Sequence, residues 1–117
     1  MRIASVRVAE EKSMLGRPPV VCLCGSTRFA EEFHKANRDF TLEGWIVLTV
    51  GFFLHQDPVG ISEVQKEQLD QLHLDKIDMA DYVYVINKGG YIGSSTRAEI
   101  EFADKLGKLT FFMEPQL

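Results

Sequence analysis

Four short apolar runs constrain the fold of this chain most. They are PVVCLCG (19–25), WIVLTVG (45–51), DYVYVIN (81–87) and KLTFFME (108–114). Apolar runs of this length, bounded by glycine or polar residues, are typical of strands that are buried on both faces of a parallel sheet. We therefore predict four strands at these positions.

The segments between the runs have the spacing of helices. After the first run, apolar residues recur at helical intervals at Phe29, Phe33, Ala36 and Phe40. Gly44 then ends the pattern, as a glycine after a helix often does. Ser62 and Gln65 form a predicted capping box for a second helix that reaches about residue 80. A third helix is predicted from about Thr96 to Leu106, with Gly107 after it.

This alternation of strands and helices predicts an α/β fold. Right-handed crossovers would give a small doubly wound parallel sheet in three layers, flavodoxin-like or Rossmann-like. The common strand order of such a sheet is 2-1-3-4, and we expect it here. The 117 residues suit one domain, predicted over 18–117. Residues 1–17 would add an edge strand through RIASVRV (2–8) or be mobile.

Charge and hydropathy restrict the expected partners. The net charge of −4 argues against binding to nucleic acid or to anionic membranes, which usually needs a concentrated basic face. No stretch approaches the roughly 20 apolar residues of a membrane helix, and the N-terminus lacks the apolar core of a signal peptide. A cytoplasmic protein is expected.

The cysteines and histidines do not indicate a metal site. Cys22 and Cys24 alternate along the first strand, so both side chains should point to the same face of the sheet. Two small buried apolar residues are favoured there over a metal or redox pair. His34, His55 and His73 lack the spacing of metal ligands, so no metal and no cofactor are predicted.

Two similar stretches, STRFAEEF (26–33) and STRAEIEF (95–102), begin helices at the predicted crevice of the sheet. A helix N-terminus attracts anions, and hydroxyl and guanidinium groups strengthen such a site. In the first stretch, Gly25 allows close backbone approach, Ser26 and Thr27 supply hydroxyls, and Arg28 can bind two oxygens at once. An ordinary N-cap followed by a surface arginine is the alternative.

Glu99 distinguishes the second stretch from the first, which has Ala30 at the matching position. It shares a helix face with Phe102, Ala103 and Leu106, so a carboxylate begins an apolar stripe. One interpretation is a capping box with Thr96. In the other, the helix dipole favours the ionised carboxylate, which could attack an anomeric carbon or stabilise a cationic sugar.

Three segments resemble the nucleoside 2-deoxyribosyltransferase superfamily, including its nucleoside-monophosphate N-glycosidase branch. They are VCLCGSTR, LHLDKIDMADYVYVIN and GGYIGSSTRAEIEFADKLGK, and the similarity extends over nearly the whole chain from Val20. The resemblance implies a flavodoxin-like fold, a homodimer or higher homo-oligomer, and cleavage of the N-glycosidic bond of a nucleotide or nucleoside. It also places the nucleophile at Glu99 and a 5'-phosphate contact at Cys24, Gly25, Ser26 and Arg28.

The chain departs from the family pattern at four positions. Where the family has a glycine, a tyrosine, an acidic residue and a catalytic aspartate, this chain has Glu101, Cys22, Gly93 and His73. His73 is either a core histidine or a neutral group that orients a sugar hydroxyl. Asp75 or Asp78 could replace the aspartate after a shift in register.

The remaining predicted site residues lie in two loops. Phe52 and Phe53 could sandwich a nucleobase and His55 could touch it, although a phenylalanine more often faces the core. Tyr91 is expected to bring its hydroxyl near Glu99. Sugar or phosphate oxygens are expected at the start of the third helix, at Gly93, Ser94, Ser95 and Thr96.

Two other functions compete with a glycosidic enzyme. Cys22 and Arg28 have the Cys-x5-Arg spacing of low-molecular-weight protein tyrosine phosphatases, which use a thiolate in a phosphate-binding loop. However, Cys22 is predicted inside the strand, before Gly25 ends it. The third candidate is a nucleotide-binding or sensing module that has kept the phosphate crevice without turnover, and the missing family acids favour it.

Overall fold

The structure, a computed structural model, describes residues 12, 14–56 and 59–116, so the expected edge strand over 2–8 lies outside the described residues. Within these residues, four parallel strands form one sheet: β1 (Val20–Gly25), β2 (Ile46–Leu48), β3 (Tyr82–Ile86) and β4 (Leu109–Phe112). Their order is β2-β1-β3-β4, as predicted. The predicted small three-layer α/β fold is therefore confirmed.

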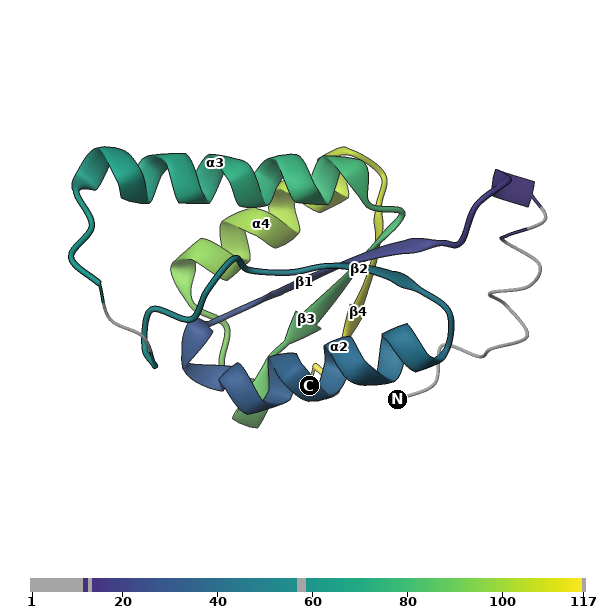
Figure 1. The fold of residues 1–117 in the computed structure, drawn as a ribbon, viewed down its shortest axis with the longest axis horizontal. Helices are drawn as coiled ribbons and strands as arrows, with labels where there is room; N and C mark the ends of the chain where they lie inside the picture. The colour runs from purple at the N-terminus through teal and green to yellow at the C-terminus, as the bar shows by residue number, and fades with distance from the viewer. Residues whose placement is uncertain (1–11, 13, 57–58, 117) are drawn as a thin grey trace.

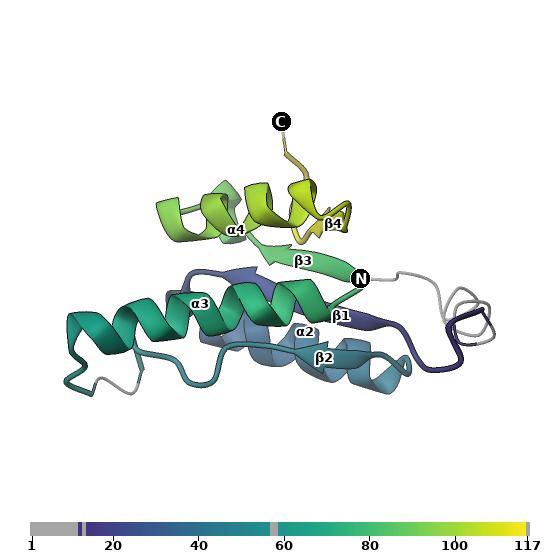
Figure 2. The ribbon, with the colours of Figure 1, turned by 90° about the horizontal axis from the view of Figure 1, so that it is seen from above.

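The helices cover both faces of the sheet. On one face lies α2 (Ala30–Leu42), which follows the short helix η1 (Thr27–Phe29). On the other face lie α3 (Glu63–Met79) and α4 (Ser94–Lys105), and a second short helix, η2 (Lys88–Gly90), precedes α4 (Figure 1 and Figure 2). The β1–β2 connection runs along the sheet in the opposite direction to the next two connections. Right-handed crossovers therefore place α2 on the face opposite to α3 and α4.

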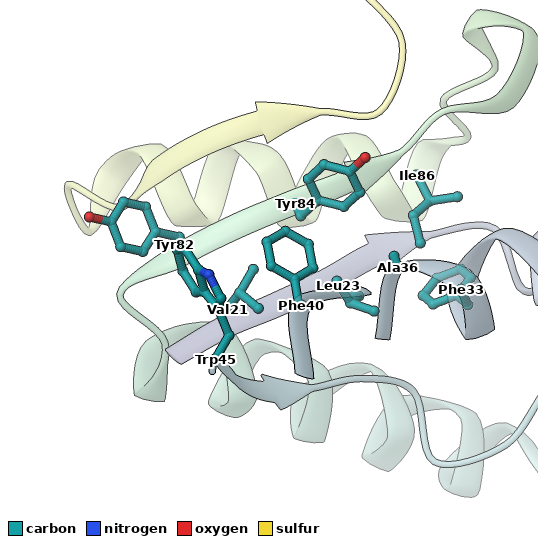
Figure 3. Close-up of a cluster of buried hydrophobic side chains, with 9 residues drawn as sticks. All are labelled: Val21, Leu23, Phe33, Ala36, Phe40, Trp45, Tyr82, Tyr84 and Ile86. Carbon is teal, nitrogen blue, oxygen red and sulfur yellow. The ribbon is translucent and has the colours of Figure 1, made fainter. Parts of the chain in front are cut away.

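The core is divided between the two faces of the sheet. Figure 3 shows the cluster between the sheet and α2, which consists of Val21, Leu23, Phe33, Ala36, Phe40, Trp45, Tyr82, Tyr84 and Ile86. The second cluster, beneath α3 and α4, consists of Val20, Cys22, Cys24, Ile77, Ala80, Val83, Val85 and Ala103. Successive side chains of a strand point to opposite faces, so both cysteines lie on the α3–α4 face, as predicted.

The structure confirms one predicted helix start and corrects another. The capping box of α3 is present, with Gln65 N donating to Ser62 Oγ at 3.1 Å and Ser62 N donating to Gln65 Oε1 at 2.9 Å. By contrast, α4 begins at Ser94, two residues before the predicted start, because its N-cap is Gly93. Thr96 is buried inside the helix, so the predicted Thr96–Glu99 capping box is wrong.

The strands are shorter than the apolar runs that predicted them. The clearest case is β2, where the run of residues 45–51 contains a strand only over Ile46–Leu48. Trp45 packs in the α2-side core, and the residues after Leu48 leave the sheet and form one wall of a cavity. Among the described helices, none has both the length and the apolar character needed to cross a membrane.

Asp81 connects the N-terminal ends of β1 and β3. Its carboxylate accepts a hydrogen bond from Val20 N at 2.9 Å and two from the Arg17 guanidinium, at 2.8 and 3.1 Å. The hydrogen bond from Arg17 lowers the pKa of Asp81 most, and the Val20 N–H and the Arg17 charge add to this effect against a smaller opposing effect of burial. The ionised carboxylate therefore stabilises the N-terminal ends of these two neighbouring strands.

We predict that Asp81→Asn lowers the free energy of unfolding by about 1 kcal/mol at neutral pH, because one acceptor remains but the charge is lost. The folded state lowers the pKa of Asp81, so the stabilisation is complete above the ordinary carboxyl pKa of about 4 and is lost as the pH falls through the folded-state value. Urea unfolding over a pH series should show the difference between wild type and variant shrinking in acid. Asp104→Asn, at an exposed residue of α4, is the control. A difference that stays constant with pH would contradict this assignment.

Candidate functional site

A cavity of about 390 Å³ lies beyond the ends of β1 and β3. Its walls come from the turn after β1, the loop after β2, one side of α3 and the first turns of α4. It brings together most of the residues predicted from sequence: Gly25, Ser26, Thr27, Phe52, His55, His73, Tyr91, Gly93, Ser94, Ser95, Thr96 and Glu99. The two STR stretches therefore contribute to one cavity.

Arg28 contacts the cavity wall without being part of its lining. Its Nε donates to Ser26 Oγ at 3.1 Å, and its Nη2 lies 3.5 Å from the Tyr91 hydroxyl. The guanidinium carbon also lies 4.4 Å from the centre of the Tyr91 ring, a cation–π contact. These contacts hold Arg28 beside two residues that line the cavity.

The two neighbouring phenylalanines of the loop after β2 have different surroundings. Phe52 lines the cavity. Phe53 instead packs on the α2-side core, with its ring edge-on to Phe33 at 5.4 Å and to His34 at 5.0 Å between centroids. Of the pair proposed to sandwich a base, Phe52 alone is among the residues that line the cavity in the described part of the chain.

The turn after β1 has features of both interpretations of the first STR stretch, an anion site and an ordinary N-cap. Ser26 is the N-cap of η1, and its Oγ accepts a hydrogen bond from Arg28 N at 3.3 Å. Thr27 Oγ1 is hydrogen-bonded to His55 Nδ1. Gly25 has a φ of 150°, and a Cβ there would lie 2.7 Å from the Ile86 carbonyl oxygen, so a side chain cannot fit between the ends of β1 and β3.

The first turn of α4 is the more favourable anion site of the two. Its N-cap is Gly93, which has no side chain to accept from the free backbone N–H groups of this turn. Ser94, Ser95 and Thr96 form the turn, and all three line the cavity. The N–H groups and the positive end of the helix dipole therefore favour negative charge at this wall.

Glu99 lies in the second turn of α4, half-buried in the cavity wall. Burial raises the pKa of its carboxyl group, and the positive charge of His73 and a hydrogen bond from the Cys24 thiol oppose this effect without cancelling it. The sequence argument placed Glu99 in the first turn, where the helix dipole favours the ionised form. Because α4 begins at Ser94, Glu99 lies in the second turn, where the dipole acts more weakly.

His73 contacts both cysteines in the core behind the cavity. Its Nε2 lies 3.5 Å from Cys24 Sγ and 3.7 Å from Cys22 Sγ, and all three side chains are buried. Hydrogen bonds from Cys24 and His73 lower the pKa of Cys22 despite burial. Burial lowers the pKa of His73, but its hydrogen bond to Cys22 and the charges of Cys22 and Glu99 raise it by more. We call Cys22, Cys24 and His73 the thiol–imidazole cluster.

Three charged residues of α3 also line the cavity and were missed by the sequence prediction. Lys66 Nζ forms an ion pair with Asp70 at 2.7 Å, and Lys76 Nζ donates to the Thr49 carbonyl at 2.6 Å. Charged residues on a helix usually indicate the face that is exposed to solvent. Here they lie beside an apolar stripe that includes His73, and this neighbourhood is the sequence signal that could have predicted their place near a site.

The cavity thus combines a half-buried carboxylate, hydroxyl groups, cations and aromatic rings, which can bind a polar small molecule. It does not include Cys22, which is fully buried inside β1. The Cys-x5-Arg stretch therefore does not present the accessible thiolate that a phosphatase of that class needs.

Comparisons of the chain with known protein families, with curated proteins and with solved structures found no match.

Proposed function

We propose that this protein cleaves or transfers at the N-glycosidic bond of a nucleotide or a (deoxy)nucleoside, with Glu99 as the nucleophile. The observation that carries this proposal is the half-buried Glu99 carboxylate in the wall of a cavity of about 390 Å³. That volume is within the range of about 300–1,000 Å³ that is typical of small-molecule sites. The family resemblance of the STR stretches supports the same chemistry.

The groups around Glu99 suit the three parts of a nucleotide. The N-terminus of α4, with Ser94 and Ser95, would bind the 5'-phosphate together with Arg28. Phe52 would stack on the base, and His55 borders the same space. The sugar would then lie between these groups, next to Glu99.

The reaction would proceed in two displacements. One Glu99 carboxylate oxygen forms a bond to the anomeric carbon while the N-glycosidic bond breaks, and that electron pair leaves with the base, which takes a proton from solvent. Water or a second base then attacks the same carbon and releases the carboxylate. Both transition states have oxocarbenium character, which an adjacent carboxylate stabilises.

A nucleotide-binding or sensing module without turnover is the second candidate. Its support is the position of His73, which stands where the family has a catalytic aspartate and is engaged with two thiols. This candidate keeps the same phosphate and base contacts. It differs in predicting binding without release of a base.

The test is to incubate the protein with ribo- and deoxyribonucleosides and their 5'-monophosphates, with and without a second base, and to measure free base by chromatography. Release from a monophosphate supports the glycosidic proposal, and a new nucleoside product with the second base identifies transfer. Binding of a monophosphate without release supports the sensing module. Absence of both binding and release across the panel would contradict both candidates.

Arg28→Ala should raise KM for a 5'-monophosphate by about 10-fold to 100-fold, because a charge-assisted hydrogen bond contributes about 1.5–3 kcal/mol. The KM for the nucleoside without a phosphate should change little. Arg97→Ala is the matched control, since Arg97 has the equivalent place in the second STR stretch and is exposed on α4. Equal effects on nucleoside and nucleotide would show that Arg28 does not bind the phosphate.

A further inference from the structure

We propose that the thiol–imidazole cluster is a binding site for a thiophilic divalent metal ion such as Zn²⁺, and that an ion bound there inhibits the chemistry of Glu99. Cys22, Cys24 and His73 offer two sulfur atoms and one ring nitrogen, all within 4.8 Å of one another. Two thiolates and an imidazole are a ligand set that favours Zn²⁺ over Mg²⁺ or Ca²⁺.

The distances within the cluster agree with tetrahedral coordination. With Zn–S bonds of about 2.3 Å and a Zn–N bond of about 2.0–2.1 Å, tetrahedral angles put the sulfur and nitrogen about 3.6 Å apart. In the structure, His73 Nε2 lies 3.5 and 3.7 Å from the two Sγ atoms. The three ligand atoms all lie within 4.8 Å of one another, so an ion could bind between them after small shifts of the side chains.

The ligands lie on packed elements of the core. β1 is a central strand, in which Cys22 is paired with Leu48 and Val83, and Cys24 with Val85. His73 is one turn before Ile77, which is fully buried in the same core cluster. A site formed by side chains on packed strands and helices keeps its geometry better than one formed on loops.

The cluster has an entrance through the cavity and an open coordination position. His73 lines the cavity, and the two cysteines lie behind it. Three protein ligands leave the fourth tetrahedral position free for water or for another oxygen. Glu99 lines the same cavity as His73, and the charges of His73 and Cys22 influence the pKa of its carboxyl group.

A divalent cation at this place would act against the proposed reaction. It would withdraw electron density from the Glu99 carboxylate and would repel the positive charge that develops on the sugar. The inhibition rests on the proposed function, whereas the binding of the ion does not. Both cysteines must be deprotonated to act as ligands, so binding of the ion depends on pH.

Metal binding can be tested without a substrate by titrating the chelator-treated full chain with CoCl₂. We expect a near-ultraviolet thiolate-to-cobalt absorption band that disappears when ZnCl₂ displaces the cobalt, since zinc binds such sites more tightly. Cys22→Ala and Cys24→Ala should each weaken binding at least about tenfold. His34→Gln, at an exposed histidine outside the cluster, should leave the band unchanged. Absence of the band, or its persistence in the Cys22→Ala/Cys24→Ala double variant, would overturn the site.

A second measurement on the wild-type chain keeps the test independent of variant folding. X-ray absorption of the zinc-loaded protein should show two sulfur ligands at about 2.3 Å and nitrogen or oxygen ligands at about 2.0–2.1 Å. A coordination shell without sulfur would overturn the site.

The inhibition is tested by base release from a monophosphate with and without ZnCl₂. We expect at least a tenfold decrease in wild type, reversed by chelator, and a much smaller decrease in Cys22→Ala. Faster release with ZnCl₂, or equal inhibition in wild type and Cys22→Ala, would overturn the inhibitory role. If no substrate is cleaved under any condition, the proposed function fails, and the cobalt and X-ray results still decide the metal site.

Discussion

Glu99→Gln is expected to slow base release by about 10³-fold or more while leaving nucleotide binding nearly unchanged. The amide has the shape of the carboxylate but neither its negative charge nor its ability to form the glycosyl intermediate. The proposed phosphate contacts, Arg28 and the first turn of α4, do not involve Glu99, so affinity should be retained. Chromatography of the free base gives the rate, and calorimetric titration with the same monophosphate gives the affinity.

Glu101→Gln provides a matched control for this variant. Glu101 is two residues further along α4 and is exposed, so the same change in charge and shape occurs outside the cavity wall. The Glu101 variant should release base at the wild-type rate. If Glu99→Gln also kept that rate, the nucleophile would have to be another group.

Gly25→Ala is expected to lower the free energy of unfolding by about 2–4 kcal/mol, the largest stability change predicted for a single methyl group in this chain. Two costs combine at this position. The backbone has a φ of 150°, which residues with a Cβ rarely adopt, and the new Cβ would lie 2.7 Å from the Ile86 carbonyl oxygen and 3.2 Å from Ile86 Cβ. Backbone atoms of a central strand cannot yield as a flexible side chain does, so β1 and β3 would have to separate.

Chemical denaturation monitored by circular dichroism would measure this change. Gly60→Ala is the control, because nothing lies within 4 Å of a Cβ at Gly60 and its φ is not in the left-handed region. It should change stability by no more than about 0.5 kcal/mol. Similar stability of the two variants would mean that the approach of β1 to β3 at Gly25 is less close than described.

The fold could be predicted from the sequence because its strongest signals are local and agree with one another. Continuous apolar runs near glycines indicated buried parallel strands, and the predicted strand order was the common one for small doubly wound sheets. The start of α4 was harder, because Ser94, Ser95 and Thr96 are all good capping residues and only the extended backbone of Gly93 distinguishes the true boundary. That error of two residues also gave Glu99 a capping role it does not have.

The site was predictable where its residues share a motif and unpredictable where they meet only in space. The two STR stretches and Glu99 were found because topology brings the ends of β1 and β3 together. His73 and Cys24 are 49 positions apart in sequence, and no local spacing indicates their contact. Likewise, nothing in the sequence shows which of the adjacent Phe52 and Phe53 faces the cavity, because a loop lacks the periodicity that assigns faces in strands and helices.

The separation of the core into two clusters has a practical consequence for spectroscopy. The chain has one tryptophan, Trp45, and it packs against Phe40 and Tyr82 on the α2 side of the sheet, whereas α3 and α4 on the other side supply much of the cavity wall. Its emission therefore reports whether the aromatic packing is intact and is shielded by the sheet from events at α3 and α4. Tryptophan fluorescence can thus show whether each variant is folded, and it can be measured on the same sample as a ligand titration.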